Sequence, residues 1–128
     1  MGLDMYAYAL NAEAVGNQQV DLEIAESEPK DELFYWRKHH DLHGWMHHLY
    51  AHKGGLSPDF NLNTVRLTAD DLDELERAVQ GKALPATTGF FFGNFPPDDE
   101  SIEMDMKFIT QARQAIADGK AVIYDSWW

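Results

Sequence analysis

The stretch that most constrains the fold is residues 35–55, YWRKHHDLHGWMHHLYAHKGG. It holds all six histidines of a 128-residue chain without cysteine, and it ends in two glycines. Apolar residues at helical spacing, followed by glycines, are typical of an amphipathic helix and its end. We therefore predict one long helix over residues 31–52, shortly after Pro29. At about 100° per residue, its expected core stripe is Tyr35, Leu42, Trp45, Met46 and Leu49.

The histidines of this predicted helix lie beside its apolar stripe. His39, His43 and His47 are each four residues apart, and imidazoles at that spacing share a helical face where they can bind one metal ion. The zincin pattern H-E-x-x-H lacks its glutamate here. A divalent metal such as zinc, held by His39 and His43 with Asp4 or Asp125, is one interpretation, and no other cofactor is predicted. The other interpretation is a structural row of histidines.

Five segments show the patterns of β-strands. Residues 3–10 and 20–24 alternate in polarity, and we expect these two segments to pair antiparallel. The other three segments are 64–67, 89–93 and 121–128. The last one ends in Trp127 and Trp128, two large apolar side chains that we expect to dock against the core.

Two further helices are predicted after the histidine-rich segment. One begins at Thr68 with a sequence typical of a capping box and ends before Gly81. The other has the acidic residues 98–100 at its N-terminal end, where their charges are favourable, and continues to Asp118 before Gly119. Because strands and helices do not alternate regularly, we predict a single α+β domain over residues 1–128. Its mostly antiparallel sheet is expected to pack against three helices.

The acidic composition restricts the classes of partner. The chain has 10 Lys and Arg against 22 Asp and Glu, a formal net charge of −12, which repels nucleic acid and anionic membranes. No apolar stretch approaches the roughly 20 residues that span a bilayer, and the first residues do not resemble a signal peptide. Together with the lack of cysteine, these features predict a cytoplasmic protein without a direct nucleic-acid or membrane partner.

The sequence lacks the patterns of common catalytic sites. There is no G-x-x-x-x-G-K-[ST] phosphate loop, and Gly89 and Gly93 enclose only phenylalanines rather than a dinucleotide fingerprint. The serines have no nucleophile-elbow or triad context. Asp125 shares a predicted strand face with Trp127, so it is a candidate functional carboxylate. The alternative is a structural carboxylate that caps backbone or pairs with an arginine such as Arg37.

Several short words in the sequence are distinctive. They are MGLDMY at 1–6, YWRKH at 35–39, HGWM at 43–46, GFFFG at 89–93 and YDSWW at 124–128. Together they resemble a group of small uncharacterised proteins from bacteriophages, prophages and bacteria, some labelled phosphoglycerate kinase. Because this chain has no nucleotide motif, we do not expect kinase activity.

These words contain the candidate residues of a binding surface or pocket. The candidates are Asp4, Tyr6, Trp36, Arg37, His39, His43, Trp45, Asp125 and Trp127. The resemblance implies a small acidic accessory protein of phage or prophage type, and the aromatic words favour binding to another protein, from the host or the phage. One alternative is a metal-dependent, hydrolase-like enzyme that uses His39, His43 and Asp125 or Asp4. Another is that the shared words specify only the fold.

Overall fold

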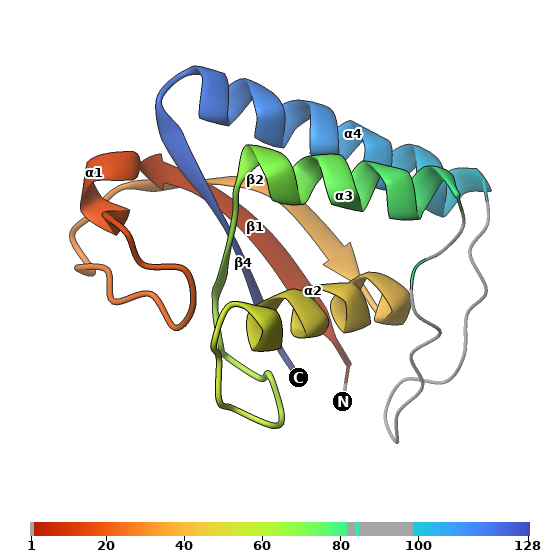
Figure 1. Cartoon of the computed structure of the whole chain (residues 1–128), viewed down its shortest axis with the longest axis horizontal. Coiled ribbons are helices and arrows are strands. Elements are labelled where there is room, and N and C mark those ends of the chain that lie inside the picture. Colours follow the sequence, from red (N-terminus) through yellow and green to blue (C-terminus); the bar gives the residue numbers. More distant parts are fainter. Residues whose placement is uncertain (1, 82–83, 85–98) are drawn as a thin grey trace.

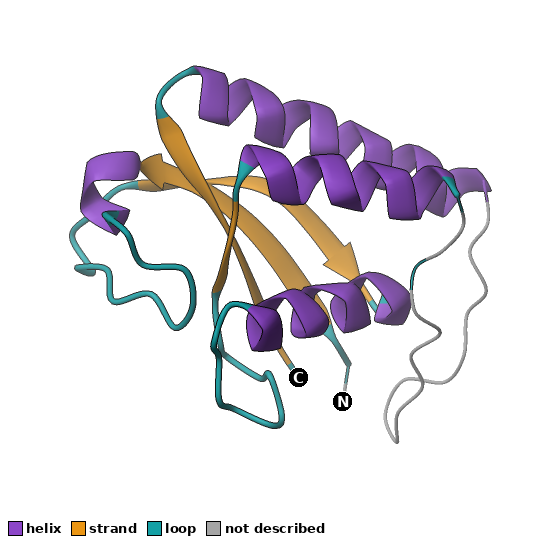
Figure 2. Ribbon diagram, in the orientation of Figure 1, coloured by secondary structure: helices purple, strands orange, loops and turns teal. Residues whose placement is uncertain are grey.

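Four antiparallel strands form one sheet in the spatial order β2-β1-β4-β3. The computed structural model describes residues 2–81, 84 and 99–128. The strands are β1 (Asp4–Asn11), β2 (Lys30–Arg37), β3 (Val65–Leu67) and β4 (Lys120–Trp127). The helices are α1 (Ala12–Val15), α2 (His40–His52), α3 (Ala69–Gln80) and α4 (Asp99–Ala117). Figures 1 and 2 show α2, α3 and α4 on one face of the sheet, which confirms the predicted α+β class.

The central strands β1 and β4 form where strands were predicted, at residues 3–10 and 121–128. They pair along their whole length, from Asp4 opposite Trp127 to Asn11 opposite Lys120. Every second side chain faces the helices and is buried, namely Met5, Ala7, Ala9, Val122, Tyr124 and Ser126. Successive residues of a strand point to opposite faces, so the side chains between these belong to the face away from α2, α3 and α4.

Residues 30–37 form β2 and not the first turns of a helix. The prediction of one helix over 31–52 is therefore wrong at its N-terminal end, and α2 begins only at His40. The run Leu33 to Trp36 is rich in aromatic residues, which fit a pleated surface, and β2 pairs with β1 through a register shift after Ala7. Pairing with β1 therefore decides the structure of these residues, although their apolar spacing also fits a helix.

The chain changes direction between β2 and α2, so the residues of the predicted core stripe no longer lie on one helix. Lys38 has a φ of +58° at this corner, a conformation that few non-glycine residues adopt. Tyr35 lies on β2 with 43% of its surface exposed, so its assignment to the core is wrong. The stripe residues on α2 keep their predicted place, with Leu42, Met46 and Leu49 buried and Trp45 partly buried against the core.

Residues 20–24 do not form the predicted strand, and they do not pair with β1. Val20 makes a single bridge to Val65, and Asp21 has a φ of +47° that interrupts any extended run. Leu22 and Ile24 instead pack against a small cluster at one end of the sheet. Their alternation reflects one buried side of an irregular segment, while β2 and β4 occupy the two edges of β1.

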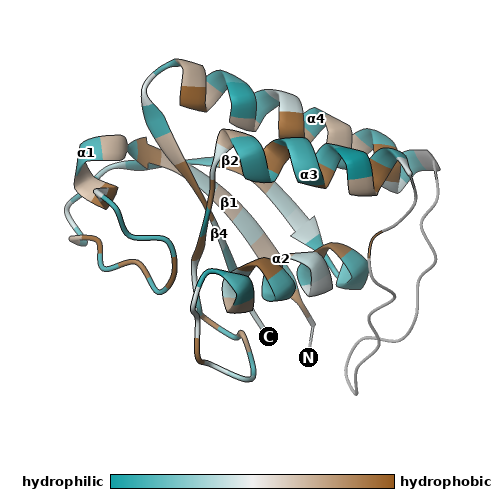
Figure 3. Ribbon diagram, viewed as in Figure 1, coloured by the Kyte–Doolittle hydropathy of each residue, from teal (hydrophilic) through white to brown (hydrophobic). Residues whose placement is uncertain are grey.

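The remaining elements agree with the sequence where they are described. Thr68 and Asp71 form both hydrogen bonds of a capping box at the start of α3, and Figure 3 shows hydrophilic and hydrophobic residues mixed along this helix. Helix α4 ends at Ala117, before Gly119 with its φ of +85°. Helix α1 is an additional short element of four residues. The strand predicted at 89–93 lies outside the described residues.

The two terminal tryptophans have different environments. Trp128 packs against the main core, and its amide and carbonyl exchange hydrogen bonds of 3.0 and 2.7 Å with the side chain of Asn61. Trp127 lies on the other face of the sheet and is 58% exposed. The predicted docking is therefore confirmed for Trp128 and wrong for Trp127, as the alternation of a strand requires. Within the described chain, none of the helices has the length and hydropathy to cross a membrane.

Candidate functional site

The two histidines favoured by the sequence lie on the helix-covered side in separate polar pairs. His43 is buried in α2, and its Nδ1 lies 2.8 Å from the Tyr124 hydroxyl of β4. Burial lowers the pKa of His43 from 6.5 to about 3, so this ring is neutral at physiological pH. His39 precedes α2, and its Nε2 lies 2.8 Å from Oδ2 of Asp105 in α4.

Asp105 is a buried carboxylate that the sequence analysis missed. It is 1% exposed, and the indole Nε1 of Trp36 donates a hydrogen bond of 3.2 Å to its other oxygen. A buried carboxylate is costly unless it is paired and hydrogen-bonded. Trp36 and His39 supply those partners, so this cluster joins α4 to β2 and to the start of α2.

The predicted metal ligands do not converge. Asp4 and Asp125 lie on one face of the sheet, whereas His43 lies on the other, against Tyr124. His39 contacts α4 on that second side as well. Among the described residues, no group of three or more His, Asp or Glu side chains is placed to hold a metal ion. The described chain therefore does not form the predicted site of His39 and His43 with Asp4 or Asp125.

The face of the sheet opposite α2, α3 and α4 brings together candidates from both ends of the chain. In the ladder, Tyr6 lies between Tyr35 on β2 and Asp125 on β4, and Asp4 lies opposite Trp127. We call this surface the open face and define it by Asp4, Tyr6, Tyr8, Tyr35, Asp125 and Trp127. Tyr8 and Tyr35 were not among the sequence candidates.

One end of the same sheet face is covered by the chain itself. Leu22 and Ile24 pack against a buried cluster that includes Leu10 and Ile123. Tyr8 lies at the border of this cluster. The open face is thus the half of the sheet nearest the start of β1 and the end of β4, where polar and aromatic side chains replace aliphatic ones.

The tyrosines of the open face form an ordered row. The rings of Tyr6 and Tyr8 stack at 5.9 Å with an interplanar angle of 12°, and Tyr6 packs against Tyr35 at 5.2 Å. The Tyr35 hydroxyl donates a hydrogen bond of 2.6 Å to Asp4, and this bond raises the pKa of Tyr35. Side chains already held in place lose little conformational entropy when a partner binds.

Asp125 stands beside this row with little compensation for its charge. Its Oδ1 accepts a hydrogen bond of 2.9 Å from the amide of Ser126, and no other group in the described part of the chain donates one to it. Burial raises the pKa of Asp125, and the charge of Lys30 opposes that rise. Of the two structural alternatives for Asp125, the hydrogen bond to backbone is present, to the Ser126 amide. The pairing with Arg37 is wrong, because Arg37 lies 4.0 Å from Asp4 instead.

A cation of the protein already contacts this surface. The Nζ of Lys30 lies 4.6 Å from the centroid of the Tyr8 ring, within the range of a cation–π interaction. Its charge is close enough to lower the pKa of Asp125. The combination of a tyrosine face and a nearby carboxylate therefore suits a positive group.

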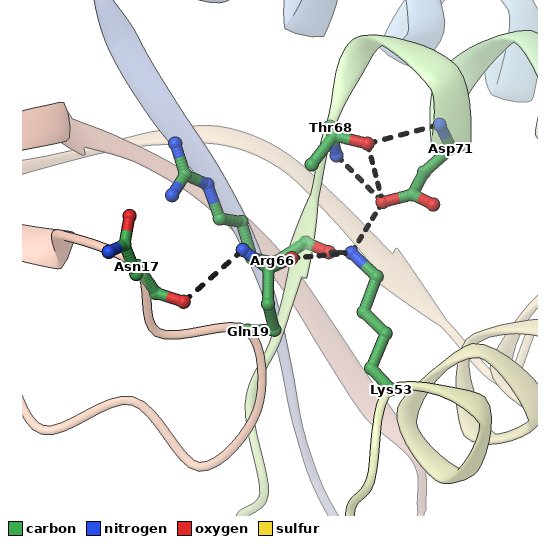
Figure 4. Close-up of polar contacts among 6 residues, drawn as sticks. All are labelled: Asn17, Gln19, Lys53, Arg66, Thr68 and Asp71. Atoms are coloured by element: carbon green, nitrogen blue, oxygen red, sulfur yellow. Dashed lines mark hydrogen bonds and ion pairs between the residues drawn. The ribbon is translucent and has the colours of Figure 1, made fainter.

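A separate polar cluster joins helix ends, and the lysine at its centre has no hydrogen-bond donor left for a ligand. The Nζ of Lys53 donates to Asp71, to the carbonyl of Arg66 and to Gln19, at 2.5, 2.6 and 3.0 Å. Figure 4 shows this arrangement, with Thr68 hydrogen-bonded to the same carboxylate. An ammonium has three donors, so Lys53 is fully used in joining α2, α3 and β3.

A hollow of about 390 Å³ lies away from the predicted residues. Its lining comes from the start of β2 and the end of α4, and it includes Asp31, Gln111 and Lys120. Lys120 and Asp31 already form an ion pair of 3.1 Å there. Glu32 and Asp118 also line this hollow, and among the described residues its lining contains none of the aromatic side chains that mark the open face.

Comparisons with family models, with curated proteins and with solved structures found no match for this chain. The assignment of a candidate site therefore depends on the geometry of this chain alone.

Proposed function

We propose that this protein is a small accessory protein that binds a basic segment of another protein on its open face. The observation that carries the proposal is the ordered row of Tyr6, Tyr8 and Tyr35 beside the poorly compensated Asp125. Tyrosine and tryptophan are enriched in protein interfaces, since they bury a large area and lose few rotamers. Trp127 offers such a side chain at the rim of the surface.

The charge of the surface favours a protein partner over nucleic acid. Aromatic side chains on a sheet can also stack on the bases of single-stranded RNA. Here Asp4 and Asp125 lie among the rings, and the chain carries a net charge of −12, which repels phosphates and attracts basic proteins. The resemblance to phage and prophage proteins extends the proposal to a host or phage partner in the bacterial cytosol.

The proposal is tested by capture experiments with matched variants. The face variant combines Tyr35→Ser and Trp127→Ser, and the control combines Leu56→Ser and Met104→Ser, which are exposed side chains elsewhere. Lysates of bacteria, infected and uninfected by phage, are passed over each immobilised protein. We expect at least one basic protein to bind the wild type and the control and to be lost from the face variant. Its purified form should then show the same difference in a direct titration.

Two results contradict the proposal. One is a set of captured proteins that is identical for the wild type and the face variant. The other is an RNA oligonucleotide that binds the wild type more tightly than any captured protein does, because the carboxylates of the open face should exclude it.

A further inference from the structure

Aromatic side chains surround Asp125 on the open face. Tyr6 lies directly opposite Asp125 across the β1–β4 ladder, where side chains approach to about 5 Å between Cβ atoms. Trp127 is the next residue on the same face of β4, about 7 Å along the strand. A group placed over the carboxylate of Asp125 would therefore touch Tyr6 on one side and Trp127 on another.

The carboxylate of Asp125 retains bonding capacity. Of its two oxygens, Oδ1 accepts the Ser126 amide, while Asp4, the neighbouring carboxylate, is engaged by Tyr35 and Arg37. Removing a charge partly from water without a close partner costs free energy. Such a cost is recovered when a cation with hydrogen-bond donors binds to the group.

Because Lys30 contacts Tyr8, it does not occupy the space between Asp125 and Trp127. The Lys30 ammonium lies over the ring of Tyr8. In the ladder Tyr8 pairs with Ile123, which is on the side of Asp125 away from Trp127. Burial still outweighs Lys30 in its effect on the pKa of Asp125. The positive group from a partner would thus occupy the side of Asp125 that faces Trp127.

We infer that Asp125, Tyr6 and Trp127 form a subsite for one arginine side chain of the bound protein. A guanidinium is planar and stacks on aromatic rings, while its fixed N–H donors reach a carboxylate at the same time. An ammonium can also lie over a ring, as Lys30 does, but it is more strongly hydrated and has no planar face to stack on a second ring. The inference depends on the proposed function, because it names the residue by which the open face recognises its partner.

The test uses short fluorescein-labelled peptides of equal length in a Gly/Ser background, which carry arginines, lysines or citrullines at the same positions. Binding is followed by fluorescence anisotropy at low ionic strength. We expect the arginine peptide to bind about five- to tenfold more tightly than the lysine peptide, and the citrulline peptide to bind least. Asp125→Asn should weaken the arginine peptide by about tenfold or more. The control Glu74→Gln removes one exposed carboxylate from α3 and should change binding by less than about twofold.

The inference is overturned if arginine and lysine peptides bind equally, or if Asp125→Asn leaves the preference unchanged. A thermal unfolding curve of Asp125→Asn shows that any loss of binding occurs in folded protein. If a captured partner is lost from the variant with Tyr35→Ser and Trp127→Ser, yet binds Asp125→Asn normally, the proposed function stands and the arginine subsite is refuted. If the captured proteins do not respond to the face variant, the proposed function itself fails.

Discussion

Asp125 lies directly opposite Tyr6 in the central ladder of the sheet, although 118 residues separate them in the sequence. The pair places a partly desolvated carboxylate against an aromatic row on the side away from α2, α3 and α4. The histidines that dominate the sequence belong to the other side, where His43 contacts Tyr124. The sheet thus separates His43 and its buried contacts from the tyrosines and carboxylates of the open face.

Replacing Asp125 with Asn should stabilise the protein while weakening the binding of a basic partner. Burial raises the pKa of Asp125, so the folded state favours the uncharged form, and Asn keeps an acceptor for the Ser126 amide. We expect unfolding to require up to about 1 kcal/mol more free energy at pH 7, or roughly 2–4 °C in melting temperature. Because the folded pKa is raised, the gain should shrink as the pH falls to the point where wild-type Asp125 is protonated.

Calorimetry of both proteins at pH 7 and near pH 4 provides the measurement. A fall in melting temperature for Asp125→Asn at pH 7 would show that the carboxylate stabilises the fold, and it would remove the physical basis for a functional role.

The terminal tryptophans should differ in their effect on stability. Trp128→Ala removes a side chain packed against the core, so we expect a loss of about 2 kcal/mol, below the 3–5 kcal/mol typical of fully buried aromatics because Trp128 is only partly buried. Trp127→Ala removes an exposed side chain and should change stability by less than about 0.5 kcal/mol. Urea denaturation of the two variants measures the difference, and equal losses would contradict the assignment of the two side chains to opposite faces.

The sequence predicted the fold where local and tertiary preferences agree. The alternation of residues 3–10, the strand pattern of residues 121–128 and the capping box at Thr68 each specify one local structure, and each is present. The apolar residues of segment 31–37 fit the spacing of an amphipathic helix and also the composition of a strand. Only the pairing with β1 decides between the two structures. For this reason the long predicted helix was wrong at one end.

The candidate site could be predicted only in pieces. Strand alternation placed Tyr6 with Asp4, and Asp125 with Trp127, but the register that joins the two pairs is a long-range property. Tyr35 was missed because it was assigned to a helix. Asp105 gave no signal, since a single acidic residue in an otherwise amphipathic helix is usually exposed.

Loss of the Asp105 carboxylate should destabilise the fold strongly. Asp105→Ala leaves the indole N–H of Trp36 without its acceptor and removes the partner of His39. An unsatisfied buried donor costs about 1–3 kcal/mol, and with the lost contact to His39 we expect a total of about 2–4 kcal/mol. The control is Asp73→Ala, which removes an exposed partner of Arg113 and should cost less than about 1 kcal/mol. Chemical denaturation of both variants makes the comparison, and a similar small loss in each would contradict the role of Asp105 as a buried link.

Because of His43, the free energy of unfolding should decrease as the pH is lowered from about 6.5 toward 3. Its pKa is lowered from 6.5 to about 3 in the folded protein, so the unfolded chain binds more protons in this range, and unfolding is favoured as the pH decreases. The stability that the neutral ring contributes is complete above pH 6.5 and is lost progressively below it. Between pH 7 and pH 5 we expect a loss of about 2 kcal/mol from this residue, since each pH unit below 6.5 contributes about 1.4 kcal/mol.

The measurement is urea denaturation at pH 7.5, 6.5, 5.5 and 5.0 for the wild type and for His43→Gln, which cannot titrate. The variant is expected to be less stable at pH 7.5, because Gln fits the space beside Tyr124 and Phe60 less well, but to have a flatter pH dependence. His40 and His47 also have lowered pKa values through burial, so part of the slope should persist in the variant. An unchanged slope in His43→Gln would show that His43 is not kept neutral by the fold.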